Sequence, residues 1–198
     1  MTRIIAGAAG SLALRVPDRG TRPTSDRVRE SLFGGLDASG ILDGARVLDL
    51  YAGSGALGLE AVSRGAASVD LVEKSASAAA VTERNARTVA RAVGSSTVRV
   101  HRSSADLFLQ STRGLFDLVF VDPPYDLDDG ALAATLALLA DVAAPGAIVI
   151  VERASRSPEP GVPAQLGLLR TKRYGDTTLW WFERELDADQ PAAPSQSR

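Results

Sequence analysis

The 198-residue sequence contains no cysteine and a single histidine, His101. The absence of cysteine excludes a disulfide-stapled secreted scaffold, a thiol nucleophile and a Cys-ligated zinc or iron–sulfur site. One histidine also excludes a His-rich metal site and any mechanism that needs two histidines. No apolar run approaches the roughly 20 residues that span a bilayer, and the start of the chain lacks the apolar stretch of a signal peptide. We therefore expect a cytoplasmic protein without a bound metal.

Lysine is scarce as well, since Lys74 and Lys172 are the only two, and nearly all positive charge is arginine. Overall, 22 basic residues face 24 acidic ones, which gives a net charge of −2. Residues 1–30 nevertheless hold six arginines and three acids, a net of +3, which leaves −5 on the rest of the chain. A basic end on an acidic body is a candidate phosphate-binding surface, and an ordinary solvated surface explains the same charges equally well.

Hydrophobic residues make up 45% of the chain and charged residues 23%, as in a globular domain. After residue 45, short apolar runs alternate with segments of helical spacing. Strands are expected over 46–50, 69–73, 98–101, 116–121 and 147–151, and helices up to 63 and over 75–93, 105–111 and 132–142. This alternation predicts a doubly wound, mostly parallel α/β sheet of seven strands, edged by a C-terminal antiparallel hairpin over 166–173 and 177–183.

The ends of the chain differ from this pattern. Residues 3–6 and 12–16 predict a small hairpin, and Thr24 or Ser25 is expected to cap a helix that frays at Gly34-Gly35. Residues from about 187 offer almost nothing to bury and predict a disordered tail. We therefore divide the chain into an N-terminal extension (1–36), a main domain (37–186) and a tail (187–198).

A glycine-rich turn follows the first strand of the main domain, in the sequence Asp49-Leu50-Tyr51-Ala52-Gly53-Ser54-Gly55. Gly53 and Gly55 allow a tight turn and a close approach of the backbone to a ligand, and the following helix points its N-terminus at that ligand. Together with Gly58, this turn also fits the dinucleotide-binding pattern. A glycine turn packed for structural reasons is the alternative.

Asp49 separates the two cofactor classes that this turn could bind. A carboxylate at the end of the strand would repel the pyrophosphate of a dinucleotide such as NAD. It suits the amino group and sulfonium of S-adenosylmethionine, so the sequence favours that cofactor. Glu73, at the end of the next strand, can accept hydrogen bonds from ribose hydroxyls. Asp106 follows the third strand and either accepts from the adenine amino group or starts a helix.

The tetrapeptide Asp122-Pro123-Pro124-Tyr125 directly follows the fourth apolar strand, where ligands bind in such sheets. The exocyclic amino group of a base is a poor nucleophile, because its lone pair is delocalised into the ring. The Asp122 carboxylate and the Pro123 carbonyl can accept its two N–H bonds and aim the lone pair at a methyl group. Pro124 stiffens the turn, and Tyr125 can stack on the base. The alternative is a structural Pro-Pro turn.

Four segments of the sequence together resemble the bacterial 16S rRNA guanine-N2 methyltransferase family. They are Arg3-Ile4-Ile5-Ala6-Gly7, Arg22-Pro23-Thr24-Ser25-Asp26-Arg27-Val28-Arg29-Glu30, the Asp49–Gly55 turn and the Asp122–Tyr125 tetrapeptide. The second segment is the specific one, since many methyltransferases share the last two. The resemblance extends from residue 3 to about 183.

The resemblance implies methylation of the N2 amino group of a flipped guanine in a partly assembled small subunit. We expect the protein to be a monomer. It implies that the N-terminal hairpin binds RNA and that the segment around Thr24 and Arg27 closes over the cofactor and the base. The implied RNA-binding residues are Arg3, Arg15, Arg19, Arg22, Arg27 and Arg29. The expected cofactor-binding residues are Thr24, Asp49, Tyr51, Ala52, Gly53, Gly55, Glu73, Lys74, Ala105 and Asp106. Family members tend to have basic residues in the first hairpin turn, where this chain has Gly7-Ala8-Ala9-Gly10-Ser11.

Two other kinds of function remain open on the sequence. The same tetrapeptide serves adenine-N6 methylation of DNA and amide methylation of protein glutamine, although the latter class usually has Asn in place of Asp122. The second kind is a non-catalytic ribosome-binding module that retains the fold. Intact Asp49, Glu73 and Asp122 argue against it.

Overall fold

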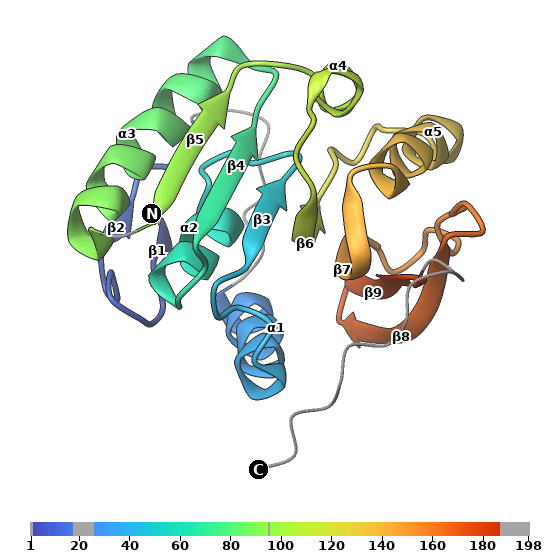
Figure 1. Ribbon diagram of the computed structural model, residues 1–198, viewed down its shortest axis with the longest axis horizontal. Coiled ribbons are helices and arrows are strands. Elements are labelled where there is room, and N and C mark those ends of the chain that lie inside the picture. The colour runs from blue at the N-terminus through green and yellow to red at the C-terminus, as the bar shows by residue number, and fades with distance from the viewer. Residues whose placement is uncertain (1, 18–25, 95, 187–198) are drawn as a thin grey trace.

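The computed structural model describes residues 2–17, 26–94 and 96–186. A mixed seven-stranded sheet forms the centre, with helices on both faces, and a separate two-stranded hairpin lies at the N-terminal side (Figure 1). The strands are β1 (Thr2–Arg3), β2 (Ala13–Leu14), β3 (Arg46–Asp49), β4 (Ser68–Val72), β5 (Thr97–His101), β6 (Phe116–Val121), β7 (Ala143–Ala154), β8 (Leu166–Tyr174) and β9 (Thr177–Arg184). The helices are α1 (Asp26–Ser39), α2 (Ala56–Ser63), α3 (Ala76–Val93), α4 (Ala105–Ser111) and α5 (Asp129–Ala140).

Three helices of the main sheet begin at side-chain caps. Ser75 accepts from the Ala78 amide at 3.4 Å, Ser104 from the Leu107 amide at 3.3 Å, and Asp128 from the Ala131 amide at 2.8 Å. Each cap satisfies a backbone N–H that has no partner within its own helix. The cap of α3 by Ser75 and the bounds of α4 and β6 confirm the predictions made for these elements.

The order of strands in the sheet is β5-β4-β3-β6-β7-β9-β8. The first five are parallel, while β9 pairs antiparallel with both β7 and β8, so the predicted C-terminal hairpin is confirmed. The chain winds outward from β3 to β5 and then returns to β6 on the other side of β3. Ligands of such sheets bind at this reversal, outside the carboxyl ends of the strands.

Two apolar clusters cover the two faces of the sheet. The first is built from the hairpin, α1, α2, α3 and one face of the strands, and the second from α4, α5 and the opposite face. Neighbouring residues alternate between them, so Val47 lies in the first cluster and Leu48 in the second, and Trp181 in the first and Phe182 in the second. The sheet therefore lies between two helical layers.

Several element bounds differ from the prediction. The helix that was expected to fray at Gly34-Gly35 continues to Ser39, because Leu36 is fully buried beside Phe33 and holds the last turn against the first cluster. The hairpin strands are shorter than predicted, with two residues each, and β7 is longer, from Ala143 to Ala154. The predicted cap at Thr24 or Ser25 and the predicted tail lie outside the described residues.

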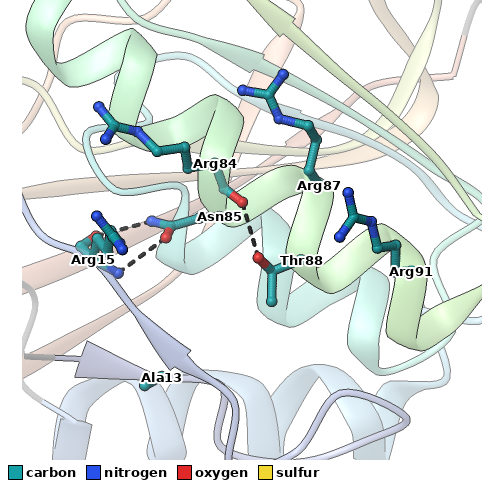
Figure 2. Close-up of a pocket in the computed structure, with 7 residues that line it drawn as sticks. All are labelled: Ala13, Arg15, Arg84, Asn85, Arg87, Thr88 and Arg91. Atoms are coloured by element: carbon teal, nitrogen blue, oxygen red, sulfur yellow. Dashed lines mark hydrogen bonds between the residues drawn. The ribbon is translucent and has the colours of Figure 1, made fainter.

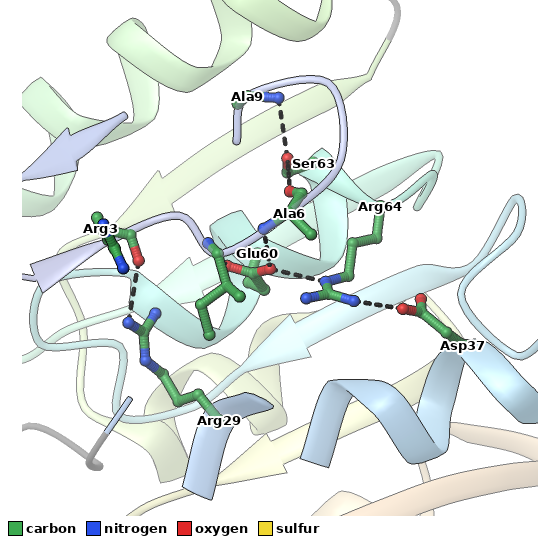
Figure 3. Close-up of polar contacts among 9 residues, drawn as sticks. Arg3, Ala6, Ala9, Arg29, Asp37, Glu60, Ser63 and Arg64 are labelled. Carbon is green, nitrogen blue, oxygen red and sulfur yellow. Dashed lines mark hydrogen bonds and ion pairs between the residues drawn. The ribbon is translucent and has the colours of Figure 1, made fainter. Parts of the chain in front are cut away.

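The N-terminal hairpin contacts the helices on one face of the sheet at two places. At its end, the backbone of Arg15 donates to Oδ1 of Asn85 at 2.9 Å and accepts from Nδ2 at 2.9 Å (Figure 2). At its turn, buried Glu60 of α2 accepts from the amides of Ile5 and Ala6 at 2.6 and 3.0 Å (Figure 3). The hairpin is therefore fastened to α3 and α2 by hydrogen bonds between distant parts of the chain.

Ser63 completes the contact at the turn and explains its small residues. The Ser63 carbonyl accepts from the Ala8 amide at 2.7 Å, and its hydroxyl accepts from the Ala9 amide at 2.9 Å. Gly7 has a φ of +82°, and a Cβ there would lie 1.9 Å from the Ser63 carbonyl oxygen. The glycine is required by both the left-handed conformation and the close backbone approach.

Candidate active site

The glycine turn forms as predicted between β3 and α2. Gly53 and Gly55 have φ values of +55° and +80°, and Gly55 is the residue that precedes the first turn of α2. Gly58 instead allows α2 to pack closely against β4, because a Cβ at this position would lie 2.4 Å from Cδ2 of Leu71. The first two glycines thus shape a backbone that a ligand can approach, and the third brings α2 close to the sheet.

Asp49 ends β3 and is 1% exposed. Its Oδ2 accepts from the Gly58 amide at 3.0 Å. Burial raises the pKa of Asp49 to about 7; the hydrogen bond from Gly58 opposes this rise, and the negative charge of Glu73 adds to it. A cationic group placed beside Asp49 would reverse the effect and stabilise the ionised carboxylate.

Glu73 follows β4 and lies against the glycine turn. Its Oε2 accepts from the Gly53 amide at 3.1 Å, and its Oε1 accepts from the Ser75 amide at 2.7 Å. An ionised carboxylate has about four acceptor positions, so both oxygens can still accept from ribose hydroxyls. The structure thus brings Asp49, Gly53 and Glu73 together at the carboxyl ends of two neighbouring strands.

Two polar side chains of α3 support the turn, and sequence reasoning did not identify them. Thr82 is fully buried and donates to the Gly53 carbonyl at 2.6 Å. Asn85 donates to the Ser54 carbonyl at 2.8 Å, in addition to its contacts with Arg15. The buried face of this helix consists otherwise of alanine and valine, so its two polar residues were the sequence feature that could have indicated a supporting role.

A second polar group surrounds Asp106. Its Oδ1 accepts from the Thr135 hydroxyl of α5 at 2.6 Å. Burial raises the pKa of the Tyr51 hydroxyl, a hydrogen bond with Thr135 opposes this rise, and the charge of Asp106 adds to it. Tyr51, Asp106 and Thr135 therefore form one network beside the glycine turn. Thr135 was not predicted, because it comes from a helix whose other buried residues are apolar.

Asp122-Pro123-Pro124-Tyr125 follows β6, the strand that pairs with β3 on the side of the reversal. The Asp49 position pairs with Phe120, so Asp122 lies two residues beyond the level of Asp49. Pro123 is buried, whereas Tyr125 is 64% exposed. The predicted catalytic tetrapeptide and the Asp49 end of β3 thus lie at the same edge of adjacent strands.

The chain after this tetrapeptide is fastened by Arg153 of β7. Its guanidinium donates to the Leu127 carbonyl at 3.2 Å and to Oδ1 of Asp129 at 2.7 Å. Leu127 in turn donates its amide to the Pro124 carbonyl at 3.0 Å. These contacts of Arg153 could not be predicted from the sequence, because its partners lie 26 and 24 residues away along the chain.

The predicted RNA-binding arginines have different positions. Arg3, Arg15 and Arg27 are exposed, whereas Arg19, Arg22 and the cofactor candidate Thr24 lie outside the described residues. Arg29 is 1% exposed and donates from Nη2 to Thr2 Oγ1, the Arg3 carbonyl and Asp26 Oδ1 at 2.8, 2.9 and 2.6 Å. The Arg3 contact is drawn in Figure 3. Arg29 fastens α1 to the hairpin, and we leave it out of the RNA surface.

The other cofactor candidates surround the same edge. Ala52 is buried in the glycine turn and donates its amide to the Val72 carbonyl at 3.0 Å. Lys74 is exposed directly after Glu73, and buried Ala105 begins α4 beside Asp106. The donor set combines a buried carboxylate for a cation, a second carboxylate for hydroxyls and an open glycine backbone. These residues fit a ligand that carries both positive charge and a ribose.

Known proteins share this architecture. The family model described as Conserved hypothetical protein 95 matches residues 2–183. Ribosomal RNA small subunit methyltransferase D of Escherichia coli strain K12 is 40% identical over 193 residues, which cover 96% of this chain and 93% of that relative. The solved structure of methyltransferase yhhF from Escherichia coli has a TM-score of 0.80 at 40% identity, covering 94% of this chain and 99% of that chain.

A more distant structure shows the fold alone. Magnesium protoporphyrin IX methyltransferase from Synechocystis PCC 6803, solved with bound SAM, is 19% identical with a TM-score of 0.64, covering 80% of this chain and 79% of that chain. The predicted class I methyltransferase fold is therefore confirmed. In the described part of the chain, no helix is both long and apolar enough to cross a membrane. The chain belongs to the Conserved hypothetical protein 95 family, together with ribosomal RNA small subunit methyltransferase D.

Proposed function

We propose that this protein is an S-adenosylmethionine-dependent methyltransferase that methylates the N2 amino group of a guanine in small-subunit rRNA. The observation that carries the proposal is the adjacency of two strand ends. Buried Asp49 ends β3, and Asp122-Pro123-Pro124-Tyr125 follows β6, its parallel neighbour at the reversal of strand order. The relationship to rRNA small subunit methyltransferase D over 96% of the chain supports rRNA as the substrate.

The cofactor would be held by the glycine turn and the carboxylates around it. Asp49 would face the positively charged methionine end, Glu73 the ribose hydroxyls, and Asp106 the adenine amino group. The backbone from Tyr51 to Gly55 would lie against the ligand, with Lys74 and Ala105 beside it and Thr24 covering it. When bound, S-adenosylmethionine supplies an electrophilic methyl group on a sulfonium.

The target base would be oriented by the tetrapeptide. The Asp122 carboxylate and the Pro123 carbonyl would accept the two N–H bonds of the guanine amino group, and Pro124 would keep the turn rigid. Exposed Tyr125 would stack on the flipped base. These contacts would draw the nitrogen toward tetrahedral geometry, so that its lone pair could form the new N–C bond as the S–C bond of the sulfonium breaks and the neutral thioether leaves. The Asp122 carboxylate, which already accepts from the amino group, would be placed to take the surplus proton. Positioning supplies the acceleration, without a covalent intermediate on the enzyme.

Different segments of the chain would have different roles. We propose that residues 1–36 bind RNA and cover the cofactor, with Arg3, Arg15, Arg19, Arg22 and Arg27 as the basic contacts. Residues 37–186 would carry cofactor binding and catalysis, and residues 187–198 would form a tail. A small-subunit particle presents a folded RNA surface to such an extension, so we propose the particle, in preference to naked RNA, as the substrate.

Transfer of label from tritiated S-adenosylmethionine tests the proposal. Small subunits that lack the modification would be compared with naked 16S rRNA, DNA and total protein. Wild-type protein should label the subunits, digestion should yield N2-methylguanosine, and Asp122→Ala should lose the activity while still binding the cofactor. Asp126→Ala, which changes a neighbouring exposed carboxylate, is the matched control and should retain the activity. Label in DNA or protein would contradict the substrate, and no label with no cofactor binding would contradict the enzyme.

A further inference from the structure

A basic hollow lies between the end of the N-terminal hairpin and the outer face of α3. Its volume is about 280 Å³, and Arg15, Arg84, Arg87 and Arg91 line it around Asn85 (Figure 2). Three of these arginines, on α3, were not among the residues predicted to bind RNA. Because an α-helix has 3.6 residues per turn, positions 84, 87 and 91 share one face and span about 10 Å along the axis.

The positive charge of this hollow is largely uncompensated. No carboxylate lines it, although Glu83 lies 3.6 Å from Arg87 on the exposed surface. Arg84 donates Nε to the Ala80 carbonyl one turn earlier at 3.1 Å. Among residues 2–17, 26–94 and 96–186, no ion pair involves Arg15, Arg84 or Arg91. The chain as a whole has a net charge of −2, so these four guanidiniums are a local concentration of charge.

The hollow has a fixed position relative to the candidate active site. Asn85 holds the backbone of Arg15 through two hydrogen bonds, each 2.9 Å long. The same side chain donates to the Ser54 carbonyl of the glycine turn at 2.8 Å. One buried residue thus connects the hairpin, the basic face of α3 and the loop proposed to hold the cofactor.

We propose that Arg15, Arg84, Arg87 and Arg91 bind the phosphodiester backbone of the RNA substrate on the hairpin side of the glycine turn. The proposal rests on the proposed function, since it identifies where the same substrate is held. Guanidinium groups bind phosphate oxygens through paired hydrogen bonds, and such contacts fix the register of a nucleic acid without reading its sequence. A concave surface with four guanidiniums on two rigidly joined elements suits a bent backbone.

Single substitutions with a matched control test this surface. Arg84→Gln and Arg91→Gln each remove one exposed guanidinium from the hollow. Arg113→Gln removes an exposed one between α4 and β6, where α4 packs on the face of the sheet opposite to α3. Binding would be measured with small subunits that lack the modification, over a range of salt concentrations. Each hollow variant should weaken binding about three- to tenfold and reduce the slope of log affinity against log salt by about 0.7 to 0.9.

Kinetics separate this inference from the proposed function. The hollow variants should raise KM for the subunits, while kcat at saturating subunits and the Kd for S-adenosylmethionine remain at wild-type values. Arg113→Gln should leave all of these unchanged. Hollow variants that match Arg113→Gln in KM and salt slope would overturn the inference. If wild-type protein binds subunits without methylating them, the proposed function fails, and the binding comparison still decides whether the hollow contacts RNA.

Discussion

The carboxylate of Asp49 accepts a hydrogen bond from the Gly58 amide at 3.0 Å, which joins the end of β3 to the first turn of α2. The carboxylate is buried, and its pKa is raised to about 7 by burial and, to a smaller extent, by the charge of Glu73. A cationic ligand binds the ionised form of this group, so ligand binding and ionisation are coupled.

We therefore expect the affinity for S-adenosylmethionine to rise as the pH increases from about 5 to 8. Binding below pH 7 should release protons, because a cation stabilises the ionised Asp49 carboxylate. Calorimetry in two buffers of different ionisation enthalpy measures both the affinity and the number of protons released. Asp49→Asn should lose most of the affinity and all proton release from this group. A wild-type affinity that is constant over this range would contradict the role given to Asp49.

Asp70 should make the fold sensitive to acid. Although burial alone would raise the pKa of Asp70, hydrogen bonds from Arg99 and His101 lower it to about 2. A carboxyl whose pKa is lowered by folding stabilises the protein above its ordinary pKa near 4, and this stability is lost as the pH falls through about 2.

Asp70→Asn is expected to lower the free energy of unfolding at pH 7 by about 2 kcal/mol. It should also reduce the loss of stability between pH 4 and 2. Urea titrations followed by circular dichroism at several pH values check both expectations. Asp43→Asn, which changes an exposed carboxylate, should retain the wild-type profile. Equal profiles for the two variants would show that the Arg99 and His101 contacts do not stabilise the fold.

Gly7 and Gly40 offer a matched pair for the docking of the hairpin. Both have left-handed backbones, with φ values of +82° and +71°, but a Cβ at Gly7 would meet the Ser63 carbonyl, and one at Gly40 would meet nothing within 4 Å. Gly40→Ala should cost about 1 to 2 kcal/mol, the strain of the left-handed conformation alone. Gly7→Ala should cost clearly more in denaturant titrations, because the hairpin must also move away from α2. Equal losses would contradict this docking.

Arg153 should affect catalysis through the loop that it fastens. Arg153→Met removes the contacts with Leu127 and Asp129 while retaining an unbranched apolar stem. We expect kcat to fall about tenfold, because the orientation of Asp122 and Pro123 becomes less defined. The Kd for S-adenosylmethionine should stay within about twofold of wild type, since the glycine turn is unaffected. The control is Arg156→Gln, which is exposed. A parallel change in Kd and kcat would indicate a general structural defect.

Much of the fold was predictable because its signals are local. The apolar runs around 46–50 and 116–121, the Ser75 cap and the glycine turn depend on residues within a few positions of one another. The predicted parallel sheet and its C-terminal hairpin followed from the alternation of these segments, whereas the order of the strands came from the structure. The end of α1 was misjudged because the packing of Leu36 outweighs the low helix propensity of Gly34-Gly35.

The sequence by itself determined the alternating sheet, the positions of Asp49, Glu73 and Asp122 at strand ends, and the small residues of the hairpin turn. Only the tertiary structure decided which side chains support them. Thr135 meets Asp106 across 29 residues, and Glu60 meets Ile5 across 55. The Arg29 side chain is buried and the Arg84 side chain is exposed, although the sequence does not distinguish a buried arginine from an exposed one. The physical reason is that periodicity and turn chemistry act along the chain, whereas burial and hydrogen-bond partners exist only after the layers have packed together.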